Sequence, residues 1–393
     1  MLRLISNEIY KTMRIGILTL PLHTNYGGIL QAYALQTVLE RMGHEVVVFD
    51  TPNKMLLPPY RKLPFILAKR ILLKCMGRID RIFIEKYNNQ IRPVIAKEIQ
   101  PFIDEKIHRK IIINFSTLEA HEFDAIVVGS DQIWRSIYFV PLWLWQTMEK
   151  AYLSFTKGWQ IKRISYAASF GTDKWEYNKK QTLHCKKALQ KFDAVSVREE
   201  NGVKLCKQYF DVDALQVLDP TMLLVANDYN ELFKKKQTPK SKGNLLNYVL
   251  DETDEIKNLI QKVASEKKMI PFAVNNPYEN DDTKPLNQRI KLSVESWLRG
   301  FYDADFVITD SFHACVFSII FKKQFIVVGN KERGMARFES LLKMFGLEDR
   351  LVDEKIDINS LQPIDYDKVY VLYGKLKEKS LHFLSENLES QLV

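Results

Sequence analysis

Apolar runs alternate with helix-like segments through the first half of the chain. The run at 14–20 is followed by a polar, glycine-containing loop and a helix-like stretch that ends near Gly43, a residue type suited to a helix C-terminus. A second apolar run completes a strand, helix, strand unit long enough for a parallel crossover. Apolar runs predict five strands in this half, at 14–20, 44–50, 124–130, 163–170 and 194–199. The alternation predicts an α/β sheet covered on both faces.

A second series of the same kind follows a lysine-rich, polar stretch at 233–243 that we interpret as a linker. Its apolar runs predict four more strands, at 245–250, 269–274, 306–310 and 324–329. We therefore expect two Rossmann-like parallel-sheet domains, over 13–225 and 244–365, and a helical tail over 366–393. Two such domains facing each other form a cleft, and ligands bind beyond the carboxyl ends of the strands.

Residues 55–110 interrupt the alternation with prolines and long stretches rich in Ile, Leu, Arg and Lys. We predict an amphipathic helical insertion in the first domain. Residues 54–110 hold 14 Lys and Arg against 5 Asp and Glu, and this difference of nine equals the net charge of +9. The insertion is interpreted either as a helical cap over the sheet or as a surface that meets a membrane or a lipid-linked substrate. No RNA-binding or helix-turn-helix signature accompanies the charge, so no nucleic-acid partner is expected.

Composition excludes several classes of protein. The chain has 393 residues, 46% of them hydrophobic, which is too apolar for a disordered or low-complexity protein. Its four cysteines form no CxxC pair, so neither a disulfide framework nor a cysteine-based zinc site is encoded. We see no signal peptide and no apolar run near the ~20 residues that span a bilayer. A cytoplasmic protein is expected, with any membrane contact at the inner face.

His313 is the leading candidate for catalysis. It lies in the segment FVITDSFHACVFSIIF, where a strand ends at Thr309 and Asp310 and a helix begins at about Ser311. The first turn of such a helix favours an anion and lowers the pKa of an imidazole. A histidine placed there can donate or accept a proton near neutral pH, although a lone histidine is more often structural.

Arg198 and Asp131 follow two other predicted strands. Arg198 in SVREENG offers a fork of donors for a carboxylate or phosphate, and its alternative role is an ion pair with Glu199 at the strand end. Asp131 and Gln132 in VVGSDQIW stand where a strand opens to solvent, and Asp131 as a helix N-cap is the default alternative.

Two further segments contribute candidates for substrate binding. HTNYGGILQAYAL places Asn25, Gly27 and Gly28 before or at the start of a helix, so that backbone N–H groups face the cleft. It lacks the full GxGxxG pattern, so a dinucleotide site is unsupported. NKERGMARF places Arg333 and Arg337 after the last predicted strand, with solvated helix residues as the alternative.

Six motifs in this order resemble the polysaccharide pyruvyl transferase family, over about residues 14–345. They are NYGGILQAYAL, VVGSDQIW, RISYAASFG, SVREENG, VLDPTMLL and TDSFHACVFSI. The resemblance implies a fold similar to the two-domain GT-B glycosyltransferases. It also implies transfer of a pyruvyl group from phosphoenolpyruvate to two hydroxyls of a sugar, in a surface glycan or its lipid-linked precursor, to give a cyclic ketal and phosphate.

The resemblance assigns roles to two residues. His313 matches the family's catalytic histidine, a general acid or base, and Arg198 matches the arginine that would hold the phosphate or carboxylate of phosphoenolpyruvate. Members of the family commonly carry an arginine two residues before the histidine, where this chain has Ser311. Either Arg333, Arg337 or a lysine of the insertion would then replace it, or the donor would differ in this branch of the family. No metal-ligand spacing is present, and we expect neither a metal nor a cofactor.

Two other interpretations of the same residues remain open. A GT-B-like glycosyltransferase would use a nucleotide sugar, although the sequence lacks the paired glutamates of the retaining enzymes after the His313 helix. A non-catalytic glycan-binding homologue would keep the fold without the chemistry.

Overall fold

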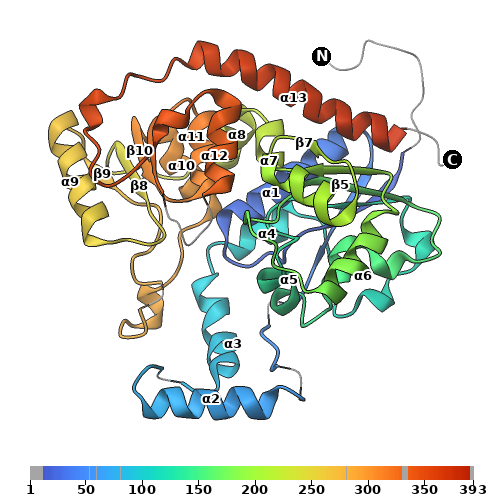
Figure 1. The fold of residues 1–393 in the computed structure, drawn as a ribbon. Helices are drawn as coiled ribbons and strands as arrows, with labels where there is room; N and C mark the ends of the chain where they lie inside the picture. The colour runs from blue at the N-terminus through green and yellow to red at the C-terminus, as the bar shows by residue number, and fades with distance from the viewer. Residues whose placement is uncertain are drawn as a thin grey trace.

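The computed structural model describes residues 12–389 except 53, 59, 80, 280 and 330–334. It contains two parallel sheets, each flanked by helices (Figure 1). The expected fold of two Rossmann-like parallel-sheet domains is therefore confirmed. No helix within the described residues is both long and apolar enough to cross a bilayer.

The first sheet has seven strands in the order β3-β2-β1-β4-β5-β6-β7. The central strands are almost entirely buried because helices cover both faces, as the continuous apolar runs require. The strands are β1 Arg14–Leu18, β2 Glu45–Asp50, β3 Arg109–Ile111, β4 Ala125–Val128, β5 Lys162–Ala168, β6 Ala194–Val197 and β7 Leu215–Gln216. Five of them lie where the apolar runs predicted strands, whereas the short edge strands β3 and β7 were not predicted.

Two of the helices around this sheet begin at asparagine caps. Asn25 accepts a hydrogen bond from Gly28 N and so caps α1, and Asn178 caps α6 through Gln181 N. The helices are α1 Tyr26–Arg41, α5 Ser136–Leu142, α6 Lys179–Leu189, α7 Glu200–Leu205 and α8 Ala226–Lys235. Although α8 precedes the second sheet in sequence, its Tyr229 and Phe233 pack on Phe317 and Tyr302 of helices beside that sheet.

The basic insertion is helical, as expected. It forms α2 Leu63–Cys75, α3 Ile84–Ile95 and α4 Gln100–Lys106 before the chain returns to the sheet edge as β3. Figure 1 shows α2 and α3 standing away from the two sheets, while α4 lies against the first one. The α4 side chains Phe102 and Ile103 are buried in the main core, but α2 buries none of its residues.

The second sheet has five strands in the order β12-β11-β10-β8-β9. Four lie at predicted positions, and only the two-residue edge strand β12 was not predicted. The strands are β8 Leu245–Tyr248, β9 Pro271–Phe272, β10 Phe306–Thr309, β11 Gln324–Val328 and β12 Leu351–Val352. The helices beside them are α9 Asp254–Lys267, α10 Val294–Asp303, α11 Phe312–Ile320 and α12 Ala336–Phe345.

The C-terminal helix α13, Tyr366–Glu389, runs along both halves of the molecule (Figure 1). Tyr366 donates to Ser318 O of the second half, whereas Tyr373 donates to Met222 O and Ser380 Oγ accepts from Leu218 N. Lys162 Nζ of the first sheet donates to Asn387 O. The helix therefore ties the two halves together and holds the 217–224 segment from one side.

Candidate active site

The candidate site lies where loops from the carboxyl ends of both sheets meet. Five of these loops leave the first sheet and one leaves the second, which is where ligands bind in open α/β folds. They carry Asn25, Gly27 and Gly28 after β1, Asp131 after β4, Ser169 after β5, Arg198 and Glu199 after β6, Asp219 after β7, and His313 after β10.

His313 is the second residue of α11 and is buried. Ser311 is the N-cap, although its side chain makes no capping hydrogen bond and its N–H donates to Thr309 Oγ1. The imidazole Nε2 lies 3.7 Å from Asp219 Oδ2, just beyond hydrogen-bond distance, and has no closer polar partner among the described residues. The predicted position at a helix start is thus observed, with a carboxylate facing the ring.

The absence of a side chain at Gly27 leaves room for the His313 ring. A Cβ added at Gly27 would lie 2.0 Å from His313 Nδ1, so only glycine allows α1 and α11 to approach this closely. A Cβ at Gly28 would meet nothing closer than 3.5 Å. Beside this contact, Tyr26 stacks on Trp297 of α10 with ring centroids 5.6 Å apart. The two halves are therefore packed together where the site lies.

Arg198 is a buried cation held by carboxylates. Its Nη1 donates to Asp219 Oδ2 at 2.9 Å, and its Nη2 lies 3.5 Å from Asp131 Oδ1. Burial alone would lower the pKa of Arg198, but the charges of Asp219, Asp131 and Glu199 outweigh burial and raise it. Arg198 Nε has no acceptor among the described residues. The side chain is therefore charged, and its Nε and Nη2 make no hydrogen bond to a described residue.

Asp219 joins Arg198 to His313, and we did not select it from the sequence. Its Oδ1 accepts from Thr221 N at 3.0 Å and Thr221 Oγ1 at 2.7 Å. Burial raises the pKa of this carboxyl, but His313, Arg198 and Thr221 together lower it below its usual value. Asp219 lies three residues after the end of β7, within the motif VLDPTMLL, and a two-residue strand leaves no periodic pattern that would mark it.

Arg337 brings a second cation to the site from α12. Its guanidinium carbon lies 5.8 Å from the centre of the Phe312 ring, and that of Arg198 lies 4.2 Å from the same ring. Burial and the charge of Arg198 lower the pKa of Arg337 to about 10, so it is still protonated at neutral pH. Two buried guanidiniums thus lie beside one ring, and the charges of Asp131 and Glu199 act on both of them. Arg333, the other arginine predicted here, lies outside the described residues.

Gln132 and Glu199 have other partners. Gln132 packs on Gly171, where an added Cβ would lie 2.0 Å from its Oε1, and it accepts from Arg135 Nη1 at 3.3 Å. Glu199 Oε1 accepts from Phe170 N at 2.8 Å. The alternative role predicted for Arg198 was an ion pair with Glu199 at the strand end. Arg198 instead pairs with Asp219 and Asp131. Among the described residues, no group of three or more His, Cys, Asp or Glu is arranged to hold a metal ion.

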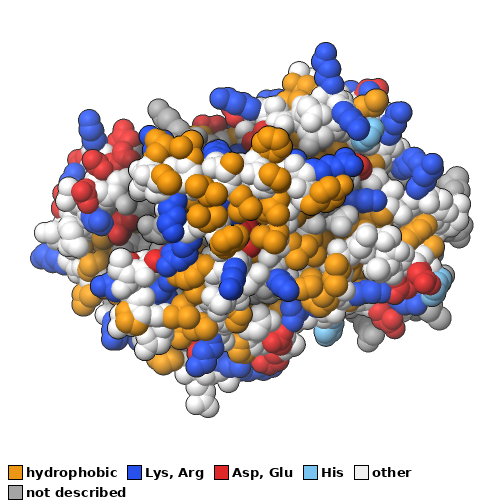
Figure 2. Space-filling view, turned by 90° about the horizontal axis from the view of Figure 1, so that it is seen from below, with side chains coloured by type: hydrophobic (Ala, Val, Ile, Leu, Met, Phe, Trp, Pro, Cys, Tyr) orange, Lys and Arg blue, Asp and Glu red, His pale blue; other side chains and the backbone are white. Residues whose placement is uncertain are grey.

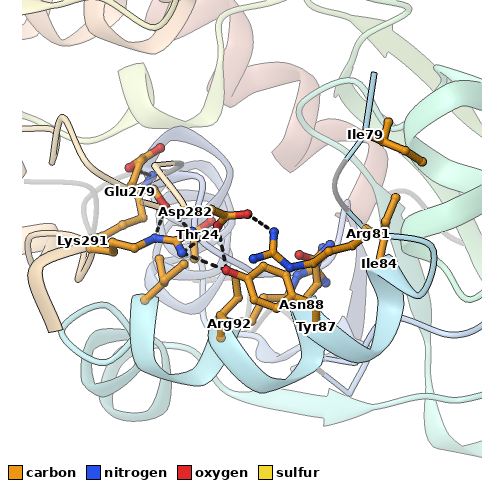
Figure 3. Close-up of a pocket in the computed structure, with 13 residues that line it drawn as sticks. Thr24, Ile79, Arg81, Ile84, Tyr87, Asn88, Arg92, Glu279, Asp282 and Lys291 are labelled. Atoms are coloured by element: carbon orange, nitrogen blue, oxygen red, sulfur yellow. Dashed lines mark hydrogen bonds and ion pairs between the residues drawn. The ribbon is translucent and has the colours of Figure 1, made fainter. Parts of the chain in front are cut away.

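Two cavities are lined by residues that lie close in sequence to residues of the site. One, of about 550 Å³, lies between α7 and α12 and is lined by Glu200 and Asn201, which follow Arg198, and by Ala336, which precedes Arg337. The other, of about 510 Å³, lies between α3 and the 279–291 segment (Figure 3). Thr24 lines it, and because Thr24 is three residues from Gly27, their Cα atoms lie within about 11 Å of each other.

The second cavity contains an arginine, Arg92, that has no counterion within the part of the chain that the structure describes. Arg81 and Arg289 both pair with Asp282, and Lys291 pairs with Glu279 (Figure 3). Arg92 makes no side-chain hydrogen bond or ion pair with any described residue, and partial burial lowers its pKa. A half-buried, uncompensated cation in a cavity favours an anionic ligand.

The fold and the site define a two-domain α/β protein with a histidine and two buried arginines at its cleft. The chain belongs to the polysaccharide pyruvyl transferase family, whose model matches residues 25–332. The resemblance carried by the six motifs is thereby confirmed. No curated protein matches the chain.

Several solved structures have a similar fold. A glycosyltransferase from Rickettsia africae is 12% identical with a TM-score of 0.44, and the match covers 98% of this chain and 96% of that one. The UDP-GlcNAc 2-epimerase of Neisseria meningitidis is 11% identical with a TM-score of 0.45, covering 96% and 95%. That of Methanocaldococcus jannaschii is 12% identical with a TM-score of 0.46, covering 95% and 100%.

Replacing Gly27 by Ala tests the contact with His313. We expect Gly27→Ala to lower the free energy of unfolding by about 1–3 kcal/mol, because the new methyl overlaps the imidazole. Gly28→Ala is the matched control one residue along the same helix turn, and it should be neutral or stabilising by about 0.5–1 kcal/mol. Urea unfolding measures both, and equal effects of the two substitutions would contradict the contact.

The lowered pKa of Asp219 predicts a loss of stability in acid. Since the folded-state pKa lies below the unfolded value of about 3.9, the ionised carboxylate stabilises the protein above that pH, and this contribution disappears as the pH falls toward the folded pKa. Asp219→Asn should lower the free energy of unfolding by about 3–5 kcal/mol at pH 7. It should also weaken the dependence of this free energy on pH below pH 4. Asp228→Asn, which breaks an exposed pair with Arg41, should cost about 1 kcal/mol. The free energy of unfolding, measured from pH 3 to 7, tests this prediction. An equal loss in the two variants would contradict the role of Asp219.

Proposed function

We propose that this protein transfers a pyruvyl group from phosphoenolpyruvate to two hydroxyls of a sugar, forming a cyclic ketal and releasing phosphate. The sugar belongs to a surface glycan or its lipid-linked precursor on the cytoplasmic side of the membrane. One observation carries the proposal within this family of transferases. His313 and Arg198, from opposite halves of the molecule, meet at the same buried oxygen of Asp219.

The donor has two anionic groups, a phosphate and a carboxylate, and the site has two buried cations. Arg198 and Arg337 lie beside the Phe312 ring, and the first backbone N–H groups of α11 add a partial positive charge. In our proposal Arg337 supplies the charge that an arginine at the position of Ser311 would otherwise supply. The cavity between α7 and α12 is the route by which the donor reaches them.

His313 is proposed to move the protons. The first sugar hydroxyl adds to C2 of phosphoenolpyruvate while the C3 methylene takes a proton and becomes a methyl group. Loss of the phosphate breaks its C2–O bond and leaves an oxocarbenium ion, which the second hydroxyl attacks to close the ketal. The two hydroxyl protons balance the one gained by C3 and the one carried away by phosphate. His313 acts as acid and base in these transfers, and Asp219 orients and stabilises the charged imidazole.

The acceptor is proposed to bind in the cavity beside α3. Arg92 and the polar side chains there suit a glycan that carries a phosphate or carboxylate. Thr24 lines this cavity, and its Cα atom lies within about 11 Å of that of Gly27, which contacts His313. A reacting hydroxyl of such a glycan can then extend from the cavity to the histidine.

Replacing His313 separates binding from chemistry. We expect His313→Gln to retain the rise in melting temperature caused by phosphoenolpyruvate, since the arginines remain. Its rate of phosphate release with an acceptor glycan should fall by about 10²–10⁴-fold. His108→Gln, at an exposed histidine paired with Glu40, is the control and should not change the rate.

Other outcomes of this experiment support the alternatives. Retained turnover in His313→Gln would remove the histidine from the chemistry. Stabilisation by a uridine or guanosine diphosphate, with none by phosphoenolpyruvate, would favour a nucleotide-sugar glycosyltransferase. Glycan binding with no phosphate release from any acceptor would favour a non-catalytic homologue.

Replacing Arg92 tests the acceptor cavity. With an acceptor in hand, Arg92→Gln should raise the KM for an anionic glycan by about tenfold, because a partly buried charge-assisted contact is lost. The KM for phosphoenolpyruvate and kcat should stay within about twofold. Arg41→Gln, at an exposed arginine of α1, is the control. An unchanged acceptor KM would place the acceptor elsewhere.

A further inference from the structure

Helix α2 exposes a continuous apolar face. Phe65, Leu72 and Met76, the last just beyond the helix end, are 79%, 60% and 52% exposed, and Ile71 beside them is 49% exposed. Spacings of seven and four residues place the first three on one side of the helix. Single exposed apolar residues are ordinary, whereas a contiguous patch of large ones marks a surface that binds something.

The opposite side of α2 is attached to the rest of the insertion. Arg70 donates to Glu85 of α3 through two hydrogen bonds of 2.7 and 2.8 Å, and to Ile82 O at 3.1 Å. The apolar side chains on the same side as Arg70, such as Leu63, Ile66 and Leu73, are half-buried. The helix is therefore held in one orientation, with its other apolar face turned to solvent.

The segment that forms α2 and its flanks carries charge of a single sign. Residues 54–79 contain seven Lys and Arg and no Asp or Glu. Figure 2, which views the molecule from the side where α2 lies, shows hydrophobic side chains gathered there with Lys and Arg among and beside them. A second copy of this surface would bring like charges together, and a neutral apolar partner would leave the cations without counterions. Apolar side chains bordered by lysines and arginines suit the interface of an anionic bilayer.

We propose that α2 binds an anionic membrane surface, with Phe65, Leu72 and Met76 inserted among the lipids and the surrounding lysines and arginines at the headgroups. The helix lies in the plane of the interface and does not cross the bilayer. Since α3 connects α2 to the cavity that contains Arg92, the bound membrane would lie next to this cavity. This last consequence, presentation of a lipid-linked acceptor, rests on the proposed function, whereas membrane binding does not.

Vesicle sedimentation tests the proposal without substrate. Wild type should sediment with vesicles of phosphatidylcholine and phosphatidylglycerol and stay in solution with phosphatidylcholine alone. The triple variant Phe65→Ser, Leu72→Ser, Met76→Ser should bind at least about tenfold more weakly. Lys69→Gln with Lys74→Gln should weaken binding mainly at low salt. The control is Ile270→Ser with Val371→Ser, at apolar residues 63% and 60% exposed elsewhere, and it should bind as wild type does.

Three results would overturn the proposal. They are equal binding to both kinds of vesicle, equal binding by the triple variant and wild type, and a wild-type dimer in solution that the triple variant abolishes. The last result would assign the face to a second copy of the chain. Unchanged melting temperatures show that the variants fold, as substitutions at exposed positions should. Because no donor or acceptor is present, the result is independent of the pyruvyl transfer.

Discussion

The buried carboxylate of Asp219 is the constraint on which the site depends. One oxygen accepts two hydrogen bonds from Thr221, and the other binds Arg198 and lies beside His313. An isolated charge in a protein interior is very costly, so these groups are stable only as a set. Helix α13 holds the same segment from outside, through the bond from Leu218 N to Ser380 Oγ. The C-terminal helix therefore supports the site although it contributes no side chain to it.

The site also depends on how closely the two halves approach. His313 comes from the second sheet, whereas Asp219 and Arg198 follow strands of the first. The missing side chain of Gly27 lets the imidazole reach that carboxylate, and the stacked rings of Tyr26 and Trp297 fix the helices on either side of the contact. A change of one methyl group at this interface alters the position of the His313 imidazole, because packed interiors do not adapt smoothly.

Strong local patterns predicted most of the fold and part of the site. Continuous apolar runs located β1, β4 and β10, because strands buried on both faces must be apolar throughout. The edge strands β3, β7 and β12 have only two or three half-exposed residues and are defined by their neighbours, so no local pattern marks them. His313 and Arg198 were predicted because each follows such an apolar run. Asp219 was missed because the two-residue strand before it leaves no recognisable pattern in the sequence. The contacts of Gln132 with Gly171 and Arg135 were not predicted because they depend on the tertiary structure.

Positive charge occurs in two separate settings in this chain, one exposed and one buried, and salt acts on them differently. The net charge of +9 equals the excess in residues 54–110, whereas the buried arginines of the site face the carboxylates of Asp219, Asp131 and Glu199. Exposed charges are screened over about 8–10 Å at 0.1–0.15 M salt, whereas buried pairs are screened much less. Added salt should therefore screen the exposed charges of the insertion while it leaves the pairing of Arg198 with Asp219 intact. The two sets of charges differ physically, because the cations of α2 are largely exposed to solvent, whereas Arg198 is buried against Asp219 and Asp131.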